Sequence, residues 1–283
     1  MTAVNVLQRS VPVHEDDRDF ADLKAIIKKK IGFNCNEYKQ AHLKRRLAVR
    51  LRASNTTSYK DYASILLKNS EEPGYLKQVL TVNVTELFRN PETYESFGRN
   101  VLPNLIRSKE SDRRIRIWSA GCSNGEEVHS IAILLLEALG SRARRFDISI
   151  LGSDIDDESL EIAAKGLYKP KNIEKIRKER LSRFFTRMDD YYTVTDDIRD
   201  IIRFKHHDMI SGVCLGGFDV IFCRNVTIYF DQKLQERLYM NFYNSLNDGG
   251  YFVMGKTETL VGPAGRMFRP VDLKERIYQK VKQ

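Results

Sequence analysis

Apolar residues recur at helical spacing through the first third of the chain. The repeat comprises Phe20, Leu23, Ile27, Ile31, Leu43, Leu47, Leu51, Tyr62, Leu66, Leu76 and Leu80. Ser58, with an acid three residues later, forms a capping box, and Pro73 suits the first turn of another helix. The pattern predicts an all-helical domain over residues 17–90, with a flexible segment over 1–16 before it and a linker helix within 91–112 after it.

Strands alternate with helices over the rest of the chain, residues 113–283. Strands are predicted at 115–119, 147–152, 218–223 and 251–254, and helices at 126–139, 158–165 and 233–246, the last ending at Asp248-Gly249-Gly250. This order is typical of an α/β doubly wound parallel sheet, and the strongly apolar third strand suits its centre. Residues 168–205 interrupt the rhythm. A charged helical stretch at 173–185 and short strands at 191–195 and 201–205 predict an inserted antiparallel β-subdomain.

Positive charge is concentrated in the helical domain. The chain has 283 residues and a formal net charge of +9, and ten basic residues against one acid lie between Lys24 and Arg52. This segment therefore carries as much net charge as the whole chain. Its second helix presents basic residues along one face, at Lys39, Arg45, Arg46, Arg50 and Arg52. The charge favours an anionic partner, which is a nucleic acid, an acidic lipid or an acidic protein face; a solvated helix face is the alternative interpretation.

Several protein classes are disfavoured by what the sequence lacks. No apolar run approaches the roughly 18 to 20 residues of a membrane helix, and residues 1–19 are acidic, without the apolar stretch of a signal peptide. The four cysteines are widely spaced, which is typical of reduced thiols. His206-His207-Asp208 has no other clustered His or Cys residues beside it, so we expect no metal site. We therefore expect a cytoplasmic protein that does not insert into a membrane.

A glycine-rich turn joins the first predicted strand to the first helix of the α/β region. It reads Trp118-Ser-Ala-Gly-Cys-Ser-Asn-Gly-Glu-Glu127. Its small residues let the backbone approach a ligand closely, and the helix start supplies free N–H groups. Glu126 and Glu127 at that helix start disfavour a polyanion and suit an ammonium or sulfonium group. The alternative is that these acids only complement the helix dipole.

Polar residues also follow the next two central strands. Asp154 and Asp156 follow the second strand, and Asn225 follows the strand 218–223. A carboxylate can accept hydrogen bonds from both hydroxyls of a ribose, although either aspartate can instead cap the following helix. Three polar strand ends at one edge of a parallel sheet predict a site for a nucleoside-containing cofactor with positive charge. S-adenosylmethionine fits that description.

The chain resembles the CheR family, chemotaxis glutamate O-methyltransferases that use S-adenosylmethionine. The resemblance covers roughly residues 17–281 and rests on four motifs in order. They are Thr81-Val-Asn-Val-Thr-Glu-Leu-Phe-Arg89, the glycine-rich turn, Gly152-Ser-Asp-Ile-Asp156 and Phe218-Asp-Val-Ile-Phe-Cys-Arg-Asn-Val-Thr-Ile-Tyr-Phe230. The family implies a Rossmann-like methyltransferase sheet with a small antiparallel β-subdomain, preceded by the helical domain.

The resemblance also implies roles for individual residues. The positions that match the family's cofactor contacts are Asn83, Thr85, Arg89, Glu127, Asp154, Asp208, Met209, Asn225 and Val226. Arg89, Arg224 and Tyr229 match catalytic positions at the mouth of the active site, where Arg89 or Tyr229 orients the substrate carboxylate. Helix capping for Thr85, and core packing for Met209 and Val226, remain open as alternatives.

The chain departs from the family pattern at three places. The glycine-rich loop continues with Val128-His129 where Pro-Tyr is usual, and we expect His129 to be a packing residue. Asp208 stands where the family often has an amide. Lys256 replaces the usual histidine in Gly255-Lys-Thr-Glu258, so its role is open.

The implied reaction is methyl transfer to glutamate side chains of chemotaxis receptors, whose helices would dock on the basic helical face. A carboxylate is already ionised at neutral pH, so no general base is needed. The alternatives are a nucleic-acid methyltransferase, disfavoured by the lack of stacking aromatics in the basic segment, and a non-catalytic binder of the methyl donor. Some family members tether to the receptor's C-terminus through a Gly-x-Gly-Pro loop. Residues 185–195 contain no glycine or proline, so we expect independence from such a tether.

Overall fold

The computed structural model describes residues 17–81, 83 and 85–281, so the flexible segment predicted at 1–16 lies outside the described residues. The chain divides into two compact units, Met1–Val82 and Asn83–Gln283. The boundary that we expected at residue 90 and the expected linker helix thus both fall inside the second unit.

The first unit is built from four helices around one apolar core. They are α1 (Asp17–Ile31), α2 (Gln40–Ala53), α3 (Tyr59–Lys68) and α4 (Glu72–Leu80), with a short 3-10 turn η1 (Cys35–Glu37). The predicted apolar positions fill the core, and among them only Ile31 is half-buried. The Ser58 N-cap of the predicted capping box is confirmed, because the Asp61 N–H donates to Ser58 Oγ at 3.1 Å, and the Asp61 carboxylate accepts the Ser58 hydroxyl at 2.6 Å. The leucine face of α2 is therefore buried, which leaves its basic residues on the remaining faces.

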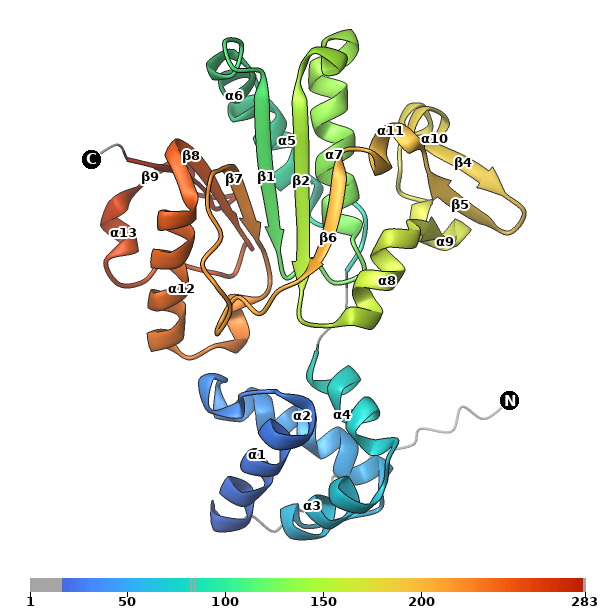
Figure 1. Ribbon diagram of the computed structural model, residues 1–283, viewed down its shortest axis with the longest axis vertical. Coiled ribbons are helices and arrows are strands. Elements are labelled where there is room, and N and C mark those ends of the chain that lie inside the picture. The colour runs from blue at the N-terminus through green and yellow to red at the C-terminus, as the bar shows by residue number, and fades with distance from the viewer. Residues whose placement is uncertain (1–16, 82, 84, 282–283) are drawn as a thin grey trace, which may run out of the picture. The chain divides into compact units, whose positions relative to one another are not determined.

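The second unit is a seven-stranded sheet with helices on both faces (Figure 1). The strand order is β6-β2-β1-β7-β8-β10-β9, with β1 (Arg114–Ala120), β2 (Asp147–Asp154), β6 (Ile202–His206), β7 (Phe218–Cys223), β8 (Leu246–Met254), β9 (Phe268–Asp272) and β10 (Ile277–Lys280). The first five strands of that order are parallel, and the last two add antiparallel pairs at one edge. As predicted, β7 is central and completely buried.

The helices that cover the sheet are α5 (Pro91–Asn100), α6 (Leu102–Ser108), α7 (Glu126–Leu139), α8 (Asp157–Lys165), α12 (Gln232–Ser245) and the short α13 (Ala264–Met267). Phe97 of α5 packs edge-on against Phe222 of β7, at 5.0 Å between ring centroids. On the opposite face, Phe242 of α12 packs against Trp118 of β1 at 5.5 Å. Alternate residues of the central strands thus contact different helix layers. A 3-10 turn, η2 (Gly140–Arg145), links α7 to β2.

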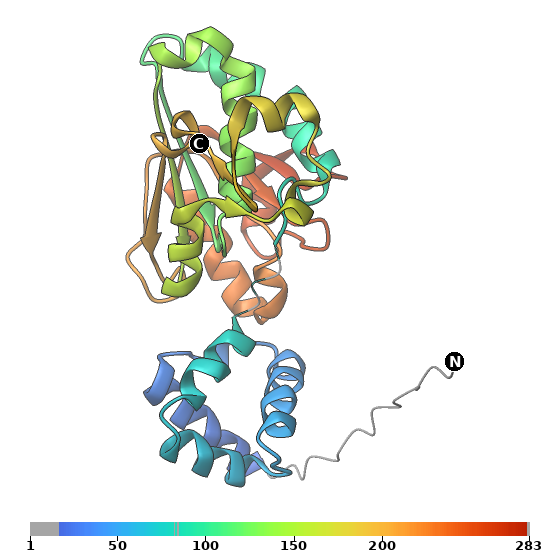
Figure 2. The ribbon, with the colours of Figure 1, turned by 90° about the vertical axis from the view of Figure 1, so that its right-hand side faces the viewer.

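A small antiparallel sheet is inserted between α8 and β6, at the right in Figure 1 and facing the viewer in Figure 2. Its order is β3-β5-β4, with β3 (Leu167–Tyr168), β4 (Phe185–Met188) and β5 (Tyr191–Val194), accompanied by α9 (Pro170–Ile173), α10 (Lys178–Phe184) and α11 (Asp196–Arg199). The predicted fold class is confirmed. The charged stretch that we expected to be one helix over 173–185 is helical mainly over α10, since α9 ends at Ile173.

Two expectations about strands are wrong. The segment 201–205 does not belong to the inserted sheet, because β6 pairs in parallel with β2 at the edge of the main sheet. Gly152 of β2 allows β6 to pair there. A Cβ on Gly152 would lie 2.7 Å from the ring of Phe204 in β6, so a side chain at this position would clash with Phe204. The strand predicted at 251–254 begins earlier, at Leu246, so Asp248-Gly249-Gly250, where we expected the preceding helix to end, lies within β8, where the pairing with β7 shifts register. In the described ranges no helix has the length and apolarity to cross a membrane.

Candidate functional site

The carboxyl ends of β1, β2 and β7 meet at one edge of the sheet, and most of the predicted cofactor contacts lie there. The turn from β1 into α7 has positive φ at Gly121 (+76°) and Gly125 (+89°), which favours glycine. A Cβ on Gly121 would lie 2.7 Å from Val226 Cγ2 and 3.5 Å from Met209 Cε. Val226 and Met209 are therefore packed against the glycine-rich turn.

Asp154, at the end of β2, supports this turn from beside it. Its Oδ2 accepts the Ser123 N–H at 2.8 Å, and its Oδ1 accepts the Asp156 N–H at 3.1 Å. Burial raises the pKa of the Asp154 carboxyl, although these backbone hydrogen bonds oppose the shift. Each carboxylate oxygen has more than one lone pair. Asp154 thus retains acceptor capacity at the place predicted for a ribose.

Asp156 does not accept the backbone N–H groups at the start of α8, as the helix-capping alternative predicted. It is the N-cap residue of α8, but its side chain accepts no backbone N–H there. Its Oδ2 instead accepts the Asn83 amide and the Ser159 hydroxyl, both at 3.0 Å. The Ser123 hydroxyl donates to Asn83 Oδ1 at 3.4 Å. Asp156 is buried, and Asn83 links it to Ser123 of the glycine-rich turn.

The two acids at the start of α7 lie in different surroundings. Glu127 accepts the Ser119 hydroxyl at 2.8 Å and Arg224 Nη1 at 3.4 Å, yet burial still raises the pKa of its carboxyl. Burial also raises the pKa of the Glu126 carboxyl, which Thr85 contacts by a side-chain hydrogen bond. The structure therefore brings Thr85 to Glu126, while Glu127 is a poorly compensated carboxylate close to the turn.

Arg224 is not at an open mouth, which corrects the prediction from the family pattern. Its side chain is only 2% exposed. Its hydrogen-bond acceptors are the Tyr94 hydroxyl (3.2 Å), Arg89 O (2.8 Å), Asn90 Oδ1 (3.1 Å) and Glu127 Oε2. The residues on either side of Arg89, Phe88 and Asn90, have positive φ. The buried guanidinium therefore anchors the backbone that carries Arg89, which is half-buried.

The loop after β7 presents Asn225, Val226 and Tyr229. Asn225 has a φ of +60°, and the 3-10 turn η3 (Thr227–Tyr229) follows it. All three residues are half-buried. Glu258, which the sequence reasoning did not single out, accepts backbone N–H groups of this loop. Its only signal in the sequence is the last place of the Gly255-Lys-Thr-Glu string.

Three further positions have local roles. Asp208 closes its own turn, because it accepts the Ile210 N–H at 2.8 Å and the Ser211 hydroxyl. His129 is buried and contacts the Tyr168 hydroxyl, which confirms it as a packing residue; burial lowers its pKa to about 3. Lys256 Nζ joins Glu92 (3.0 Å) to Glu275 (3.2 Å).

The histidines next to Asp208 have separate partners. His206 contacts Asp157 at 2.7 Å, and His207 packs edge-on against Trp118. Over the described ranges, no three His, Cys, Asp or Glu side chains are grouped so that they could hold a metal ion.

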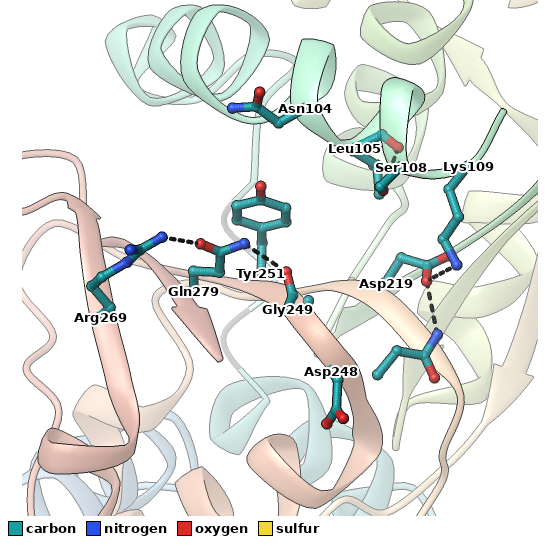
Figure 3. A pocket seen from close by; sticks show the side chains of 12 residues that line it. Asn104, Leu105, Ser108, Lys109, Asp219, Asp248, Gly249, Tyr251, Arg269 and Gln279 are labelled. Atoms are coloured by element: carbon teal, nitrogen blue, oxygen red, sulfur yellow. Dashed lines mark hydrogen bonds and ion pairs between the residues drawn. The ribbon is translucent and has the colours of Figure 1, made fainter. Parts of the chain in front are cut away.

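A pocket of about 500 Å³ opens at the other edge of the sheet, near the starts of β7 and β8 (Figure 3). The buried Asp219 accepts hydrogen bonds from Lys109 and Asn247, each at 2.7 Å. Gln279 accepts one from Arg269 at 2.7 Å. These polar groups pair with one another, and none of the predicted site residues lines the pocket. It is separate from the candidate cofactor site.

The predicted docking residues of the helical unit differ in exposure. Lys39, Arg45 and Arg52 are exposed, and Arg46 is half-buried. Arg50 forms two hydrogen bonds with the buried Glu72, at 2.9 and 2.7 Å. Its guanidinium is therefore held inside the unit.

Sequence comparisons identify the family. The profile of the CheR methyltransferase SAM-binding domain matches residues 83–277, and that of the CheR all-alpha domain matches residues 18–81. The chain belongs to the CheR methyltransferase family. The matched ranges coincide closely with the two compact units.

Curated relatives agree with this CheR assignment. Chemotaxis protein methyltransferase 2 of Vibrio cholerae is 34% identical over 250 residues, which cover 86% of both chains. Chemotaxis protein methyltransferase 2 of Pseudomonas aeruginosa is 33% identical over 257 residues, covering 88% of this chain and 89% of the relative. The chemotaxis protein methyltransferase of Listeria innocua is 29% identical over 248 residues, covering 88% and 92%.

Solved structures overlap less. A geranyl diphosphate C-methyltransferase from Streptomyces coelicolor covers 50% of this chain and 38% of its own, with a TM-score of 0.29 and 15% identity. The family assignment therefore rests on the sequence profiles and relatives. This CheR family member is an S-adenosylmethionine-dependent methyltransferase.

Proposed function

We propose that this enzyme transfers the methyl group of S-adenosylmethionine to glutamate side chains in the cytoplasmic helices of chemotaxis receptors. The names of its relatives support a role in chemotaxis. The observation that carries the proposal is the pair of half-buried carboxylates, Asp154 and Glu127, beside the glycine-rich turn, with the pKa of both raised because they are partly removed from water. Such a pair suits a ligand that bears both hydroxyls and an ammonium group.

Each carboxylate has a role in binding the methyl donor. Asp154 accepts hydrogen bonds from the ribose hydroxyls, and Glu127 pairs with the ammonium of the methionine part. Asn225, Val226, Met209 and Asp208 bind the adenine side. Asn83, Thr85 and Arg89 close the site from the segment before α5. The contacts of Val226 and Met209 with Gly121, and of Asn83 with Asp156, support this grouping.

The reaction requires positioning more than proton transfer. S-adenosylmethionine supplies a methyl group on a sulfonium, which is already a good leaving group. The substrate carboxylate is ionised at neutral pH, so neither a general base nor a metal ion is needed. Arg89 or Tyr229 orients this carboxylate in line with the methyl group, with water excluded. Arg224 acts on Arg89 as a positioning residue, which its hydrogen bond to Arg89 O supports.

Receptor helices dock on the basic face of α2. The acidic methylation regions of receptors complement a surface formed by Lys39, Arg45, Arg46 and Arg52. Arg50 contributes to this face only through the fold of the unit, because Glu72 holds it in place. Steering between exposed charges is weakened by salt, so the docking contribution should fall as ionic strength rises.

The enzyme works without a receptor tether. In the small sheet, β4 and β5 are joined by the two-residue turn Asp189-Asp190, since Met188 pairs directly with Tyr191. A turn this tight leaves little loop to clasp an added peptide strand. Without a second binding site, affinity for the receptor should be modest. Tight binding of the isolated tail peptide to residues 185–205, with poor methylation of tail-less receptor, would contradict independence.

The experiment is transfer of tritiated methyl groups, with and without a chelator, to cytoplasmic fragments of the organism's own receptors. Fragments with and without the C-terminal tail form two arms, and duplex DNA and structured RNA form a third. We expect equal labelling of both receptor forms, release of the label as methanol by mild base, and no labelling of nucleic acid. Labelled nucleic acid with unlabelled receptor would favour the alternative that the basic segment first suggested. Loss of labelling on chelation would contradict metal independence.

A further inference from the structure

Glu258 is a buried carboxylate that organises the loop after β7. Its exposed fraction is 3%. Its two oxygens accept one hydroxyl and five backbone N–H groups, which are Thr227 Oγ1 and the amides of Asn225, Val226, Thr227, Ile228 and Gly255. The lengths run from 2.6 Å at Gly255 to 3.3 Å at Ile228. Consecutive backbone amides that converge in this way form an anion-binding nest.

The nest exists because the chain turns sharply at the end of β7. Asn225 has a φ of +60°, in the left-handed region that few residues adopt. Four successive N–H groups then face inward, where unpaired amides would be costly. Glu258 fills this place from a second turn, in which its own N–H donates to Gly255 O at 2.9 Å. One side chain therefore satisfies the donors that the turn exposes.

Gly255 is fitted to the same arrangement. A Cβ at this position would lie 2.7 Å from Glu258 Oε2 and 2.8 Å from Asn225 N. The carboxylate and the loop thus approach the backbone so closely that a side chain at residue 255 would displace one of them. Glu258, Gly255 and the loop consequently form one packed unit.

We propose that Glu258 is a positioning residue for methyl-donor binding, acting through the loop that presents Asn225 and Val226. Val226 is the residue that packs against Gly121, so a shift of the loop would also disturb the glycine-rich turn. The proposal rests on the assignment of Asn225 and Val226 as cofactor contacts. Glu258 itself makes no contact with the methyl donor in this account. Its carboxylate geometry sets the affinity for the donor instead.

The test compares Glu258→Gln with Glu275→Gln, each in the full chain. Glu275 is a matched control, because it is 4% exposed and binds Thr93 and Lys256. Glu258→Gln keeps the size of the side chain but turns an NH₂ group toward the N–H donors of the loop. For Glu258→Gln we expect at least about a tenfold loss of S-adenosylhomocysteine affinity by calorimetry, because charge-assisted hydrogen bonds are lost. Glu275→Gln should change the melting temperature with affinity within about twofold of wild type.

Two further readouts separate positioning from general stability. Amide hydrogen exchange of the segment 224–230 should speed up in Glu258→Gln and not in Glu275→Gln. The KM for S-adenosylmethionine should rise by a larger factor than kcat falls. If Glu258→Gln does not fold, Gly255→Ala, which presses on the same carboxylate, should show these changes. Wild-type affinity in a folded Glu258→Gln protein, or affinity losses in both glutamate variants that follow melting temperature, would overturn the proposal.

The variant Asn225→Ala distinguishes an error in the proposed cofactor site from an error in the role proposed for Glu258. If this variant binds S-adenosylhomocysteine as wild type does, the assignment of the cofactor contacts is wrong. If Asn225→Ala weakens binding while Glu258→Gln does not, the cofactor site stands and only the positioning role of Glu258 fails.

Discussion

Each unit of this protein contains a buried cluster of one arginine, one glutamate and one tyrosine, and the two clusters are bonded differently. In the helical unit, Glu72 accepts two hydrogen bonds from Arg50 and one from the Tyr62 hydroxyl at 2.6 Å. Burial alone would raise the pKa of Glu72, but its hydrogen bonds with Arg50 and Tyr62 hold it below its usual value. The carboxylate is fully compensated.

In the α/β unit, Glu127 is left with one long contact to its arginine. Arg224 Nη1 lies 3.4 Å from the Glu127 carboxylate, and Arg224 Nη2 donates to Arg89 O and Asn90 Oδ1. Burial therefore prevails, and the pKa of Glu127 is raised. Removing one member of a compensated cluster destabilises a fold, whereas a carboxylate whose charge is poorly compensated is suited to bind a cationic ligand. We propose that the same residue types serve structure in one unit and ligand binding in the other.

The largest expected effect comes from breaking the compensated cluster. Arg50→Ala removes the cation and leaves Glu72 buried, which should lower the free energy of unfolding by about 3 to 5 kcal/mol. Chemical denaturation of the full chain measures this change. Arg45→Ala is the control, because Arg45 is exposed and its loss should cost less than about 0.5 kcal/mol. Equal stability of the two variants would show that the Arg50–Glu72 pair does not hold the helical unit together.

Asp154 extends the comparison within the α/β unit. Asp154→Ala should weaken S-adenosylhomocysteine binding by about 2 to 4 kcal/mol, because two hydrogen bonds to a charged acceptor are lost. Calorimetric titration measures the loss, and circular dichroism verifies the fold. Since burial raises the pKa of Asp154, wild-type affinity should begin to fall at a higher pH than for an ordinary aspartate. Unchanged affinity in a folded variant would remove Asp154 from the site.

His129 gives a structural counterpart close to the site. Burial lowers its pKa to about 3, so in the fold it stays neutral where an unfolded histidine takes up a proton. Between pH 6.5 and 3 the unfolded state binds more protons, and stability falls as the pH falls. The loss from pH 8 to pH 5 should be about 2 kcal/mol.

His129→Gln removes this titration and keeps a polar partner for Tyr168. The variant should therefore lose less stability than wild type over the same pH range, as measured by denaturation at each pH. Parallel stability curves for the two proteins would contradict the role given to His129.

The smallest effect concerns the exposed cations of α2. The double variant Arg45→Ala/Arg52→Ala should have a KM for receptor fragments that is about fivefold higher, which corresponds to about 1 kcal/mol. Its cofactor affinity should not change. Arg107→Ala, an exposed cation of α6, is the control. The difference between the variants should disappear at high salt. A KM effect that persists in high salt would argue against docking by charge.

Local signals in the sequence predicted the elements of the site well. The bounds of α7 and β7 agree with expectation because periodic apolar residues and flanking glycines determine them. The convergence of Asp154, Glu127 and Asn225 follows from parallel strands alone. The placement of these strand ends was thus predictable from short segments, while their roles in binding stay a prediction.

Long-range partners were not accessible in this way. The pairing of Arg50 with Glu72 joins residues 22 positions apart, and Arg224 meets Asn90 across 134 positions. Whether a charged side chain is buried depends on such partners. From the sequence we therefore expected Arg50 on the docking face and Arg224 at the mouth of the active site. Glu258 was missed for the same reason, because the N–H groups that donate to it lie about 30 residues upstream. Strand β6 was misassigned because its pairing with β2 depends on tertiary packing.

Calorimetric titration of S-adenosylhomocysteine into Glu127→Gln and Glu72→Gln tests the contrast between the two clusters most directly. For Glu127→Gln we predict an affinity at least about tenfold weaker than wild type, with a smaller loss of unfolding free energy than in Glu72→Gln, because the charge that is removed was poorly compensated, although its removal leaves the buried Arg224 without a carboxylate partner. For Glu72→Gln we predict wild-type affinity and a free energy of unfolding lower by about 2 kcal/mol. Wild-type affinity in Glu127→Gln, or a greater loss of stability there than in Glu72→Gln, would contradict the assignment of one cluster to ligand binding and the other to structure.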